Sequence, residues 1–156
     1  MPSQVLTPQA IETAFVRFLR AHAAVTRQLS ARLEADHGLT LSDYDVLVQL
    51  YYAPERSLRR VDIARAVLLT ASGITRLLDG LERAGWVEKR ACSTDARVSY
   101  AVLTDAGVEK FETAQASHRA DIQELFASRF SLEEREQLAE LLGRLPLAET
   151  AEACSA

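Results

Sequence analysis

Three polar side chains, Ser72, Thr75 and Arg76, lie in a stretch whose apolar residues have helical spacing. These apolar residues follow the i, i+3, i+4, i+7 rule of an amphipathic helix: Ile74, Leu77, Leu78 and Leu81. The two hydroxyls and the guanidinium therefore face outward, together with Asp79 and Arg83. Hydroxyl and guanidinium groups on an exposed helix can hydrogen-bond the base edges of a DNA major groove. A solvated helix face has the same composition, so this helix alone fits both interpretations.

Positive charge gathers around this helix, although the whole chain has a net charge of −4. Between Arg56 and Arg97 the sequence has nine basic and five acidic side chains, whereas the rest has nine basic and 17 acidic ones. A basic segment within an acidic chain is typical of a lobe that binds a polyanion and is carried by a separate scaffold.

Composition narrows the class of protein further. The 156 residues are 48% hydrophobic and 26% charged, as in ordinary globular proteins. The sequence has no apolar run near the roughly 20 residues that span a bilayer and no signal-peptide pattern, so we expect a cytoplasmic protein without a membrane partner. The two cysteines, Cys92 and Cys154, are predicted to be reduced thiols in that compartment.

The elements that position the polar helix begin with two predicted helices. Residues 8–37 contain no glycine, and their apolar positions recur at spacings of four and three, which predicts one long helix that ends near Gly38. A second helix is predicted over residues 42–52, with Ser42 as its N-cap and Pro54 just beyond its end.

Two short helices are predicted within residues 58–85. The first is predicted to bury four apolar residues: Val61, Ile63, Ala64 and Val67. The joint between the two helices falls at residues 68–70. Thr70 caps the second helix, which carries the three polar side chains and ends at Gly85. Two helices joined by a tight turn are the arrangement of a helix-turn-helix.

A β-hairpin is predicted next, from extended stretches at 86–90 and 97–103 around a polar tip at 92–96. Val98, Tyr100 and Val102 alternate with smaller residues, as in a strand. Basic residues flank the tip, and an arginine there can enter a DNA minor groove. Helix, turn, helix and basic hairpin form the order of a winged helix-turn-helix, which favours a DNA-binding lobe over a merely solvated helix face.

The chain ends in two further predicted helices. One runs from residue 104 to about 129, and a capping box at Ser131 and Glu134 opens the last. The first and last helices have more apolar surface than the small lobe can cover, which predicts a homodimer formed through the two ends. The expected fold class is mainly α with a small β-hairpin wing (α+β). Its predicted parts are an N-terminal dimerisation helix (1–38), a winged helix-turn-helix lobe (39–103) and C-terminal helices that complete the dimerisation domain (104–156).

The stretch from Leu47 to Gly107 resembles the MarR family of bacterial transcription regulators. The resemblance rests on VDIARAVLLTASGITRLLDGLERAGWVEKR, on Asp95-Ala96-Arg97 in the wing and on the following AVLTDAG. The helices at the two ends also lie where that family has its dimerisation domain. The resemblance implies a homodimer that binds a pseudo-palindromic operator, usually as a repressor, and releases it when a small anionic or phenolic compound binds between the two lobes.

The same resemblance implies DNA contacts at individual positions. Ser72, Thr75 and Arg76 would face the major groove, with Arg76 as a bidentate partner for guanine. Arg97 would enter the minor groove, and Asp95 would brace the wing from within the protein. Phosphate contacts are implied at three further residues: Thr70, Arg90 and Ser93.

A ligand site is predicted between the first helix and the DNA-binding lobe. His22 interrupts the apolar stripe of the first helix, and Tyr51 lies on the second helix, which should pack nearby. As a pair they would hydrogen-bond a carboxylate or a phenol. The alternative is a satisfied core histidine and an interface tyrosine.

Other functions have weaker support in the sequence. Cys92 lies beside Arg90, and an adjacent cation lowers a thiol pKa, so a thiol-responsive regulator is one alternative. The oxidant sensors of the family, however, carry their cysteine near the start of the first helix. A second alternative is a helical dimeric interaction module that does not bind DNA, but such a module would not need a basic wing. No enzyme, metal or cofactor is expected, because catalytic motifs and metal-ligand spacings are lacking.

Overall fold

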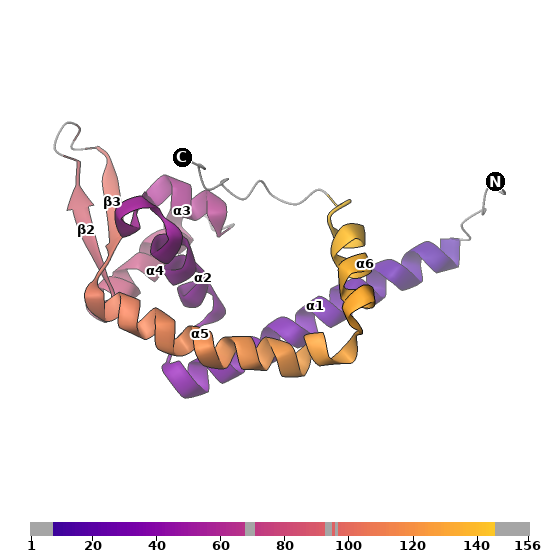
Figure 1. The fold of residues 1–156 in the computed structure, drawn as a ribbon. Helices are drawn as coiled ribbons and strands as arrows, with labels where there is room; N and C mark the ends of the chain where they lie inside the picture. Colours follow the sequence, from indigo (N-terminus) through magenta and orange to yellow (C-terminus); the bar gives the residue numbers. More distant parts are fainter. Residues whose placement is uncertain (1–7, 68–70, 93–94, 96, 146–156) are drawn as a thin grey trace.

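The computed structural model describes residues 8–67, 71–92, 95 and 97–145 (Figure 1). Its helices are α1 (Pro8–His37), α2 (Leu41–Tyr52), α3 (Arg60–Ala66), α4 (Ala71–Arg83), α5 (Asp105–Leu125) and α6 (Leu132–Leu142). Its strands are β1 (Ser57–Arg59), β2 (Val87–Ala91) and β3 (Ser99–Leu103), and two 3₁₀ turns cover Pro54–Arg56 and Ala127–Arg129. The expected fold class, mainly α with a small β wing, is confirmed.

The first two helices are separated where the sequence predicts, but the cap of α2 differs. α1 ends at His37 because Gly38 adopts a φ of +64°, which glycine reaches without strain. Thr40 caps α2 in place of the predicted Ser42. The Thr40 hydroxyl accepts from the Asp43 amide at 3.1 Å, and the Thr40 amide donates to the Asp43 carboxylate at 2.9 Å. This capping box satisfies two amides at once, which a serine inside the first turn cannot do.

The strands form one antiparallel sheet in the order β1-β3-β2. The predicted hairpin is β2 with β3, paired from Val87 opposite Leu103 to Ala91 opposite Ser99. The second strand therefore begins at Ser99, two residues later than predicted. Ala101 and Leu103 belong to the main core, and Val102 between them is buried as well. Consecutive residues of a strand point to opposite faces, so both faces of the central strand β3 are covered there.

The sequence did not predict β1. This strand has three residues and pairs Ser57 with Val102 and Arg59 with Tyr100. It follows a turn in which Glu55 and Arg56 have φ values of 52° and 53°. A strand this short shows no alternation of its own, so only its pairing with β3 defines it.

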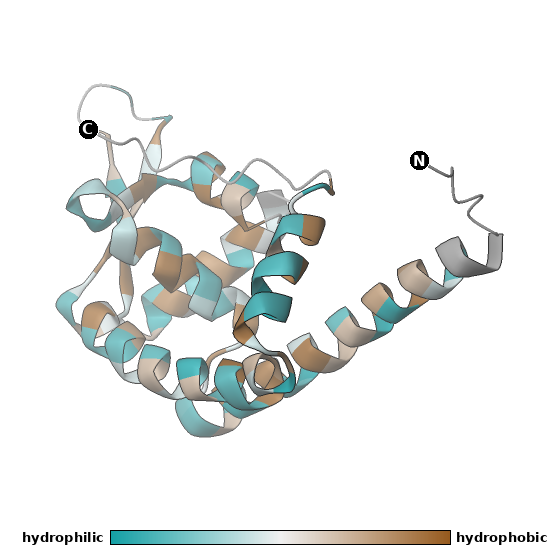
Figure 2. Cartoon of the chain, turned by 45° about the vertical axis from the view of Figure 1, so that its right-hand side comes forward, coloured by the Kyte–Doolittle hydropathy of each residue, from teal (hydrophilic) through white to brown (hydrophobic). Residues whose placement is uncertain are grey.

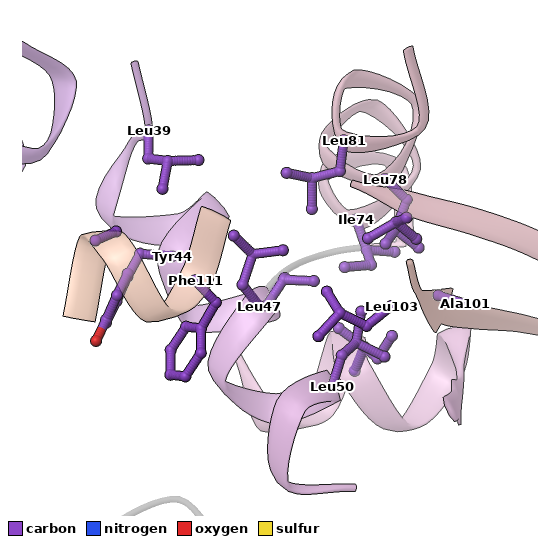
Figure 3. Packing of buried hydrophobic residues seen from close by; sticks show 14 of the residues in the cluster. Leu39, Tyr44, Leu47, Leu50, Ile74, Leu78, Leu81, Ala101, Leu103 and Phe111 are labelled. Atoms are coloured by element: carbon purple, nitrogen blue, oxygen red, sulfur yellow. The ribbon is translucent and has the colours of Figure 1, made fainter. Parts of the chain in front are cut away.

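The main core lies where α2, α4, α5 and β3 meet. Figure 3 shows Leu47 of α2 between Phe111 of α5 and the buried side chains of α4. Of the four residues of α4 that were predicted to face inward, Ile74, Leu78 and Leu81 are buried. The fourth, Leu77, is half-buried. In α3 only part of the prediction holds, because Ile63 is buried but Val61 is 56% exposed. Two residues along a helix turn the side chain by about 200°, so Val61 and Ile63 lie on opposite faces.

The two long helices, α1 and α5, form the base of the molecule (Figure 1). Arg32 of α1 binds two carboxylates of α5, with Nη1 2.6 Å from Asp121 Oδ1 and Nη2 2.8 Å from Glu124 Oε1. The N-terminal part of α1 projects beyond the rest of the chain and carries exposed hydrophobic residues (Figure 2), of which Phe15 is 60% exposed. α5 ends at Leu125, and residues 127–129, predicted to be helical, form a 3₁₀ turn.

Candidate nucleic-acid interface

The outward face of α4 is divided into two parts. Ser72 and Arg76 are exposed on one part. On the other part Thr75 is half-buried, and its Oγ1 accepts from Arg60 Nη2 of α3 at 2.7 Å. Sequence patterns did not indicate Arg60 as a partner of Thr75. Arg60 was included only in the count of basic residues, because no sequence pattern pairs position 60 with position 75.

Asp79 also belongs to the second part of this face, and it contacts the wing. Lys89 of β2 has its Nζ 2.6 Å from Asp79 Oδ1 and 3.1 Å from Glu82 Oε2. The hydrogen bond from Lys89 holds the pKa of Asp79 below its ordinary value, and the two carboxylates raise the pKa of Lys89. α4 and the wing are therefore joined by a charged contact as well as by apolar packing.

The described part of the wing shows how its turn is held. Asp95 Oδ1 accepts from the Arg97 amide at 2.9 Å, and the Asp95 carbonyl accepts from the Val98 amide at 3.0 Å. The Arg97 residue itself is exposed. Arg90 Nη2 lies 2.9 Å from Glu88 Oε1, so this predicted phosphate contact carries a neighbouring carboxylate.

Two predicted phosphate contacts, Thr70 and Ser93, lie outside the described residues, as does the predicted joint at residues 68–70. Cys154 lies outside them too. Cys92 is half-buried at the end of β2, where its amide donates to the Val98 carbonyl at 3.0 Å.

A cleft of about 330 Å³ lies between α3, α4 and the start of β3. Three arginines line it, together with small and apolar residues: Arg59, Arg60 and Arg97, with Val61, Ala64, Ile74, Thr75, Val98 and Ser99. Arg59 is paired with Asp62, from Nε to Oδ2 at 2.7 Å. The cleft thus brings Arg97 of the wing together with Thr75 of α4, two residues that the sequence assigned to different grooves.

A second cavity, of about 390 Å³, lies against α2 and the buried His118 of α5. His118 is 6% exposed, and its Nδ1 has no hydrogen-bond partner among the described residues. Burial lowers the pKa of His118, whereas burial raises the pKa values of Tyr44 and Asp45 beside it. Sequence patterns did not identify His118, although its spacing from Phe111 and Ala114 places it on the buried stripe of α5.

The structure does not join the predicted ligand pair, His22 and Tyr51, within one chain. His22 is exposed on α1, and its ring neighbour is Phe18 at 6.4 Å between centroids. Tyr51 packs on Phe111 at 4.5 Å, and its hydroxyl donates to Glu112 at 2.8 Å. These contacts tie Tyr51 to α5.

The described residues contain neither a cluster of metal ligands nor a membrane-spanning helix. Among them, no group of three His, Cys, Asp or Glu side chains lies close enough to hold a metal ion. No described helix has the length and apolar content needed to cross a membrane.

The chain is similar to known transcription regulators. A family model described as the MarR family matches residues 37–98. The regulator MhqR of Bacillus subtilis is 30% identical over 85% of this chain and 89% of that protein. The B. subtilis repressor YetL is 31% identical over 71% of this chain and 66% of that protein.

Solved structures that resemble this chain are also MarR-family transcription regulators. The MarR-family regulator Sco3205 of Streptomyces coelicolor, determined in complex with DNA, matches with a TM-score of 0.82 and 26% identity. The match covers 91% of this chain and 88% of that chain. AbsC of the same organism matches with a TM-score of 0.80 and 28% identity over 90% and 93% of the two chains. The chain therefore belongs to the MarR family, and it is a DNA-binding transcription regulator rather than an enzyme.

Proposed function

We propose that this regulator is a cytoplasmic homodimer that binds a pseudo-palindromic operator and represses transcription until a small ligand releases it. One observation carries the DNA-binding part of the proposal. α4 leaves Ser72 and Arg76 exposed while Thr75 and Asp79 are held by α3 and β2. A recognition helix fixed to its wing in this way can enter the major groove as a rigid unit.

The proposed DNA contacts follow from this orientation. Ser72 and Arg76 face the major groove, with Arg76 the bidentate partner of a guanine. Thr75 contacts the groove from the edge of this face, with its hydroxyl held by Arg60. Arg97 enters the minor groove, and Asp95 braces the wing through the Arg97 amide. Thr70, Arg90 and Ser93 contact phosphates. The complex of Sco3205 with DNA supports a similar use of the lobe here.

The proposed dimer uses both ends of the chain. Phe15, Phe18 and Leu19 are exposed on α1, and Leu141 and Leu145 are exposed at the other end. Large exposed apolar side chains gathered on two projecting helices favour burial against a second copy. This supports the division into a DNA-binding lobe (39–103) and a dimerisation domain built from residues 1–38 and 104–156. The name of YetL as a repressor supports the proposed sign of regulation.

A small phenolic or carboxylate compound is the proposed release signal. The cavity beside His118 supports it, because a buried imidazole nitrogen without a partner among the described residues can hydrogen-bond a phenol or a carboxylate. At the His22 and Tyr51 pair, a ligand must first displace Glu112 from the Tyr51 hydroxyl. Binding that changes the spacing of the two lobes weakens both half-site contacts together.

The experiment that tests the proposal is selection of bound sequences from a random DNA pool by the purified protein. We expect an inverted repeat with half-sites about one helical turn, roughly 34–36 Å, apart and a steep loss of affinity with salt. Enrichment without sequence preference would contradict the proposal and favour a helical interaction module. Release of the selected DNA by a phenolic acid, absent in His118→Leu, tests the ligand part.

A further inference from the structure

The cleft between α3, α4 and β3 carries positive charge that is only partly balanced by acidic side chains within the described part of the chain. None of the described residues that line it is acidic. Arg59 is balanced by Asp62, but neither Arg60 nor Arg97 forms an ion pair within the described residues. Asp79, on which Arg60 acts at longer range, is already bound by Lys89. A cleft with these two cations is suited to an anion.

The position of the cleft indicates which anion. It lies between α4, proposed for the major groove, and the wing, proposed for the adjacent minor groove. In a DNA duplex the sugar-phosphate backbone separates these two grooves. A protein that inserts one element into each groove must therefore have a strand of phosphates pass between the two elements.

Arg60 is built to serve both sides of this cleft. A guanidinium has five N–H donors in a planar fork, and one of them, on Nη2, reaches Thr75 Oγ1 at 2.7 Å. Its remaining donors match the geometry of a phosphate group. One side chain can thus hold the recognition helix and bind the backbone next to it.

We propose that the cleft receives a backbone phosphate of the operator, which Arg60 binds while the same guanidinium holds Thr75. This inference rests on the proposed function. It adds a DNA contact on α3, outside the recognition helix and the wing. Arg60 contributes affinity for any DNA sequence, because a phosphate carries no base identity.

The test compares Arg60→Gln with two control variants in the full-length protein. Glutamine removes the charge and keeps a polar N–H donor, on a side chain two bonds shorter than that of arginine. Arg65→Ala removes the same charge from an exposed position of the same helix. Thr75→Val removes the acceptor and leaves Arg60 charged. Affinities for the selected operator and for unrelated DNA are measured at several salt concentrations between roughly 50 and 200 mM.

We expect Arg60→Gln to weaken binding to both DNAs by about tenfold and to reduce the salt slope by about 0.9 per subunit. Arg65→Ala should keep the wild-type slope. Thr75→Val removes a proposed base contact and should weaken operator binding, but it should keep the wild-type slope because the lost hydroxyl carries no charge. A salt slope of Arg60→Gln equal to that of Arg65→Ala would overturn the proposal. So would a Thr75→Val protein that loses the same slope, because Arg60 would then act only by positioning α4.

Two further measurements distinguish a backbone phosphate from a free anion in the cleft. If millimolar inorganic phosphate raises the melting temperature of the wild-type protein but not of Arg60→Gln, while both bind the operator equally, the cleft holds a free anion and the DNA assignment is wrong. Arg60→Lys, which restores the charge, should recover most of the salt slope; failure to do so also contradicts a phosphate contact. The proposed function fails on a separate result, namely that the wild-type protein binds no DNA or binds it without sequence preference.

Discussion

Two residues at the start of α5 fix the joint between the wing and the helical base. The Thr104 hydroxyl donates to the Gly85 carbonyl at 2.7 Å and accepts from the Gly107 amide at 3.0 Å. A Cβ atom on Gly107 would overlap the Trp86 carbonyl oxygen and press on the Leu103 side chain. The glycine that ends the AVLTDAG stretch is thus required by the close approach of α5 to the backbone before β2.

We expect Gly107→Ala to lower the free energy of unfolding by about 1–3 kcal/mol, the usual cost of overpacking a filled site. Urea denaturation monitored by circular dichroism measures it. Gly80→Ala is the matched control, because a Cβ there meets nothing within 4 Å. In the interior of α4 that change should be neutral or stabilise by up to about 1 kcal/mol. Equal changes in the free energy of unfolding for the two variants would show that the contact with Trp86 does not determine the effect of the substitution at Gly107.

Loss of Arg76, proposed for the major groove, and loss of Arg97, proposed for the minor groove, should change DNA binding in different ways. Arg97→Ala removes a minor-groove contact and should weaken operator binding by about 1–3 kcal/mol in a gel-shift titration. Arg76→Ala should relax base preference at one position of each half-site. Arg144→Ala, on an exposed residue beyond α6, is the charge-matched control. An Arg76→Ala protein that is uniformly weaker on all sequences would identify Arg76 as a phosphate contact.

His118 predicts a pH dependence of stability. Burial lowers its pKa in the folded state, so the unfolded chain, with a pKa of about 6.5, binds more protons in the window just below that value. The contribution of His118 to stability is therefore present above pH 6.5 and is lost as the pH falls through the lower, folded pKa. Chemical denaturation from pH 7.5 to 5 should show a smaller pH-dependent loss in His118→Gln than in the wild type. His22→Gln, at an exposed position, should retain the wild-type dependence, and a change there would contradict the assignment.

At the scale of elements, the sequence predicted those that its own local pattern defines. The helices, the hairpin and the capping box at Ser131 follow from periodicity and capping, and the structure has them all. β1 was missed because a three-residue strand is defined by its partner strand. Val61 was misplaced because a seven-residue helix buries one narrow face, here around Ile63.

The candidate site was predictable to a similar extent. The exposure of Ser72 and Arg76 follows from the helical period of α4. Contacts between segments distant in sequence, such as Arg60 with Thr75 or Lys89 with Asp79, have no linear signal. They depend on which way the packed elements face one another.

The contact between Lys89 and α4 predicts that wing and recognition helix act as one unit. Lys89→Met removes the ion pairs with Asp79 and Glu82, so the wing should take more orientations relative to α4. Because these groups are partly exposed, we expect little change in melting temperature. Operator affinity should fall on the order of fivefold, measured by fluorescence anisotropy. Lys110→Met, which removes a lysine from the face of Trp86 instead, should bind the operator normally; an equal loss there would refute a specific role of Lys89.

At the scale of the whole molecule, the shape of the chain separates a compact lobe from a projecting helix (Figure 2). Arg32 binds the C-terminal half of α1 to α5, whereas the N-terminal half exposes its apolar residues. A single helix with exposed phenylalanines gains most by packing against a second copy. In the proposed dimer, each lobe is half of a DNA-binding unit whose two recognition helices are held at a fixed separation.

The proposed dimer can be tested by changing one face of α1 at a time. Phe15→Glu puts a carboxylate on the apolar face, whereas Arg17→Glu puts one about 200° around the same helix. Sedimentation should show Phe15→Glu as a monomer and Arg17→Glu as a dimer, because burying an unpaired charge is costly.

In a dimer, binding of one subunit holds the second subunit at a high effective concentration near the second half-site. A monomer binds one half-site without this advantage. Its operator affinity should therefore fall by about 100-fold or more. Its affinity for an isolated half-site should stay close to that of the wild type. A Phe15→Glu protein that still sediments as a dimer would show that the two subunits meet elsewhere, and a monomer with undiminished operator affinity would show that the half-sites are read independently.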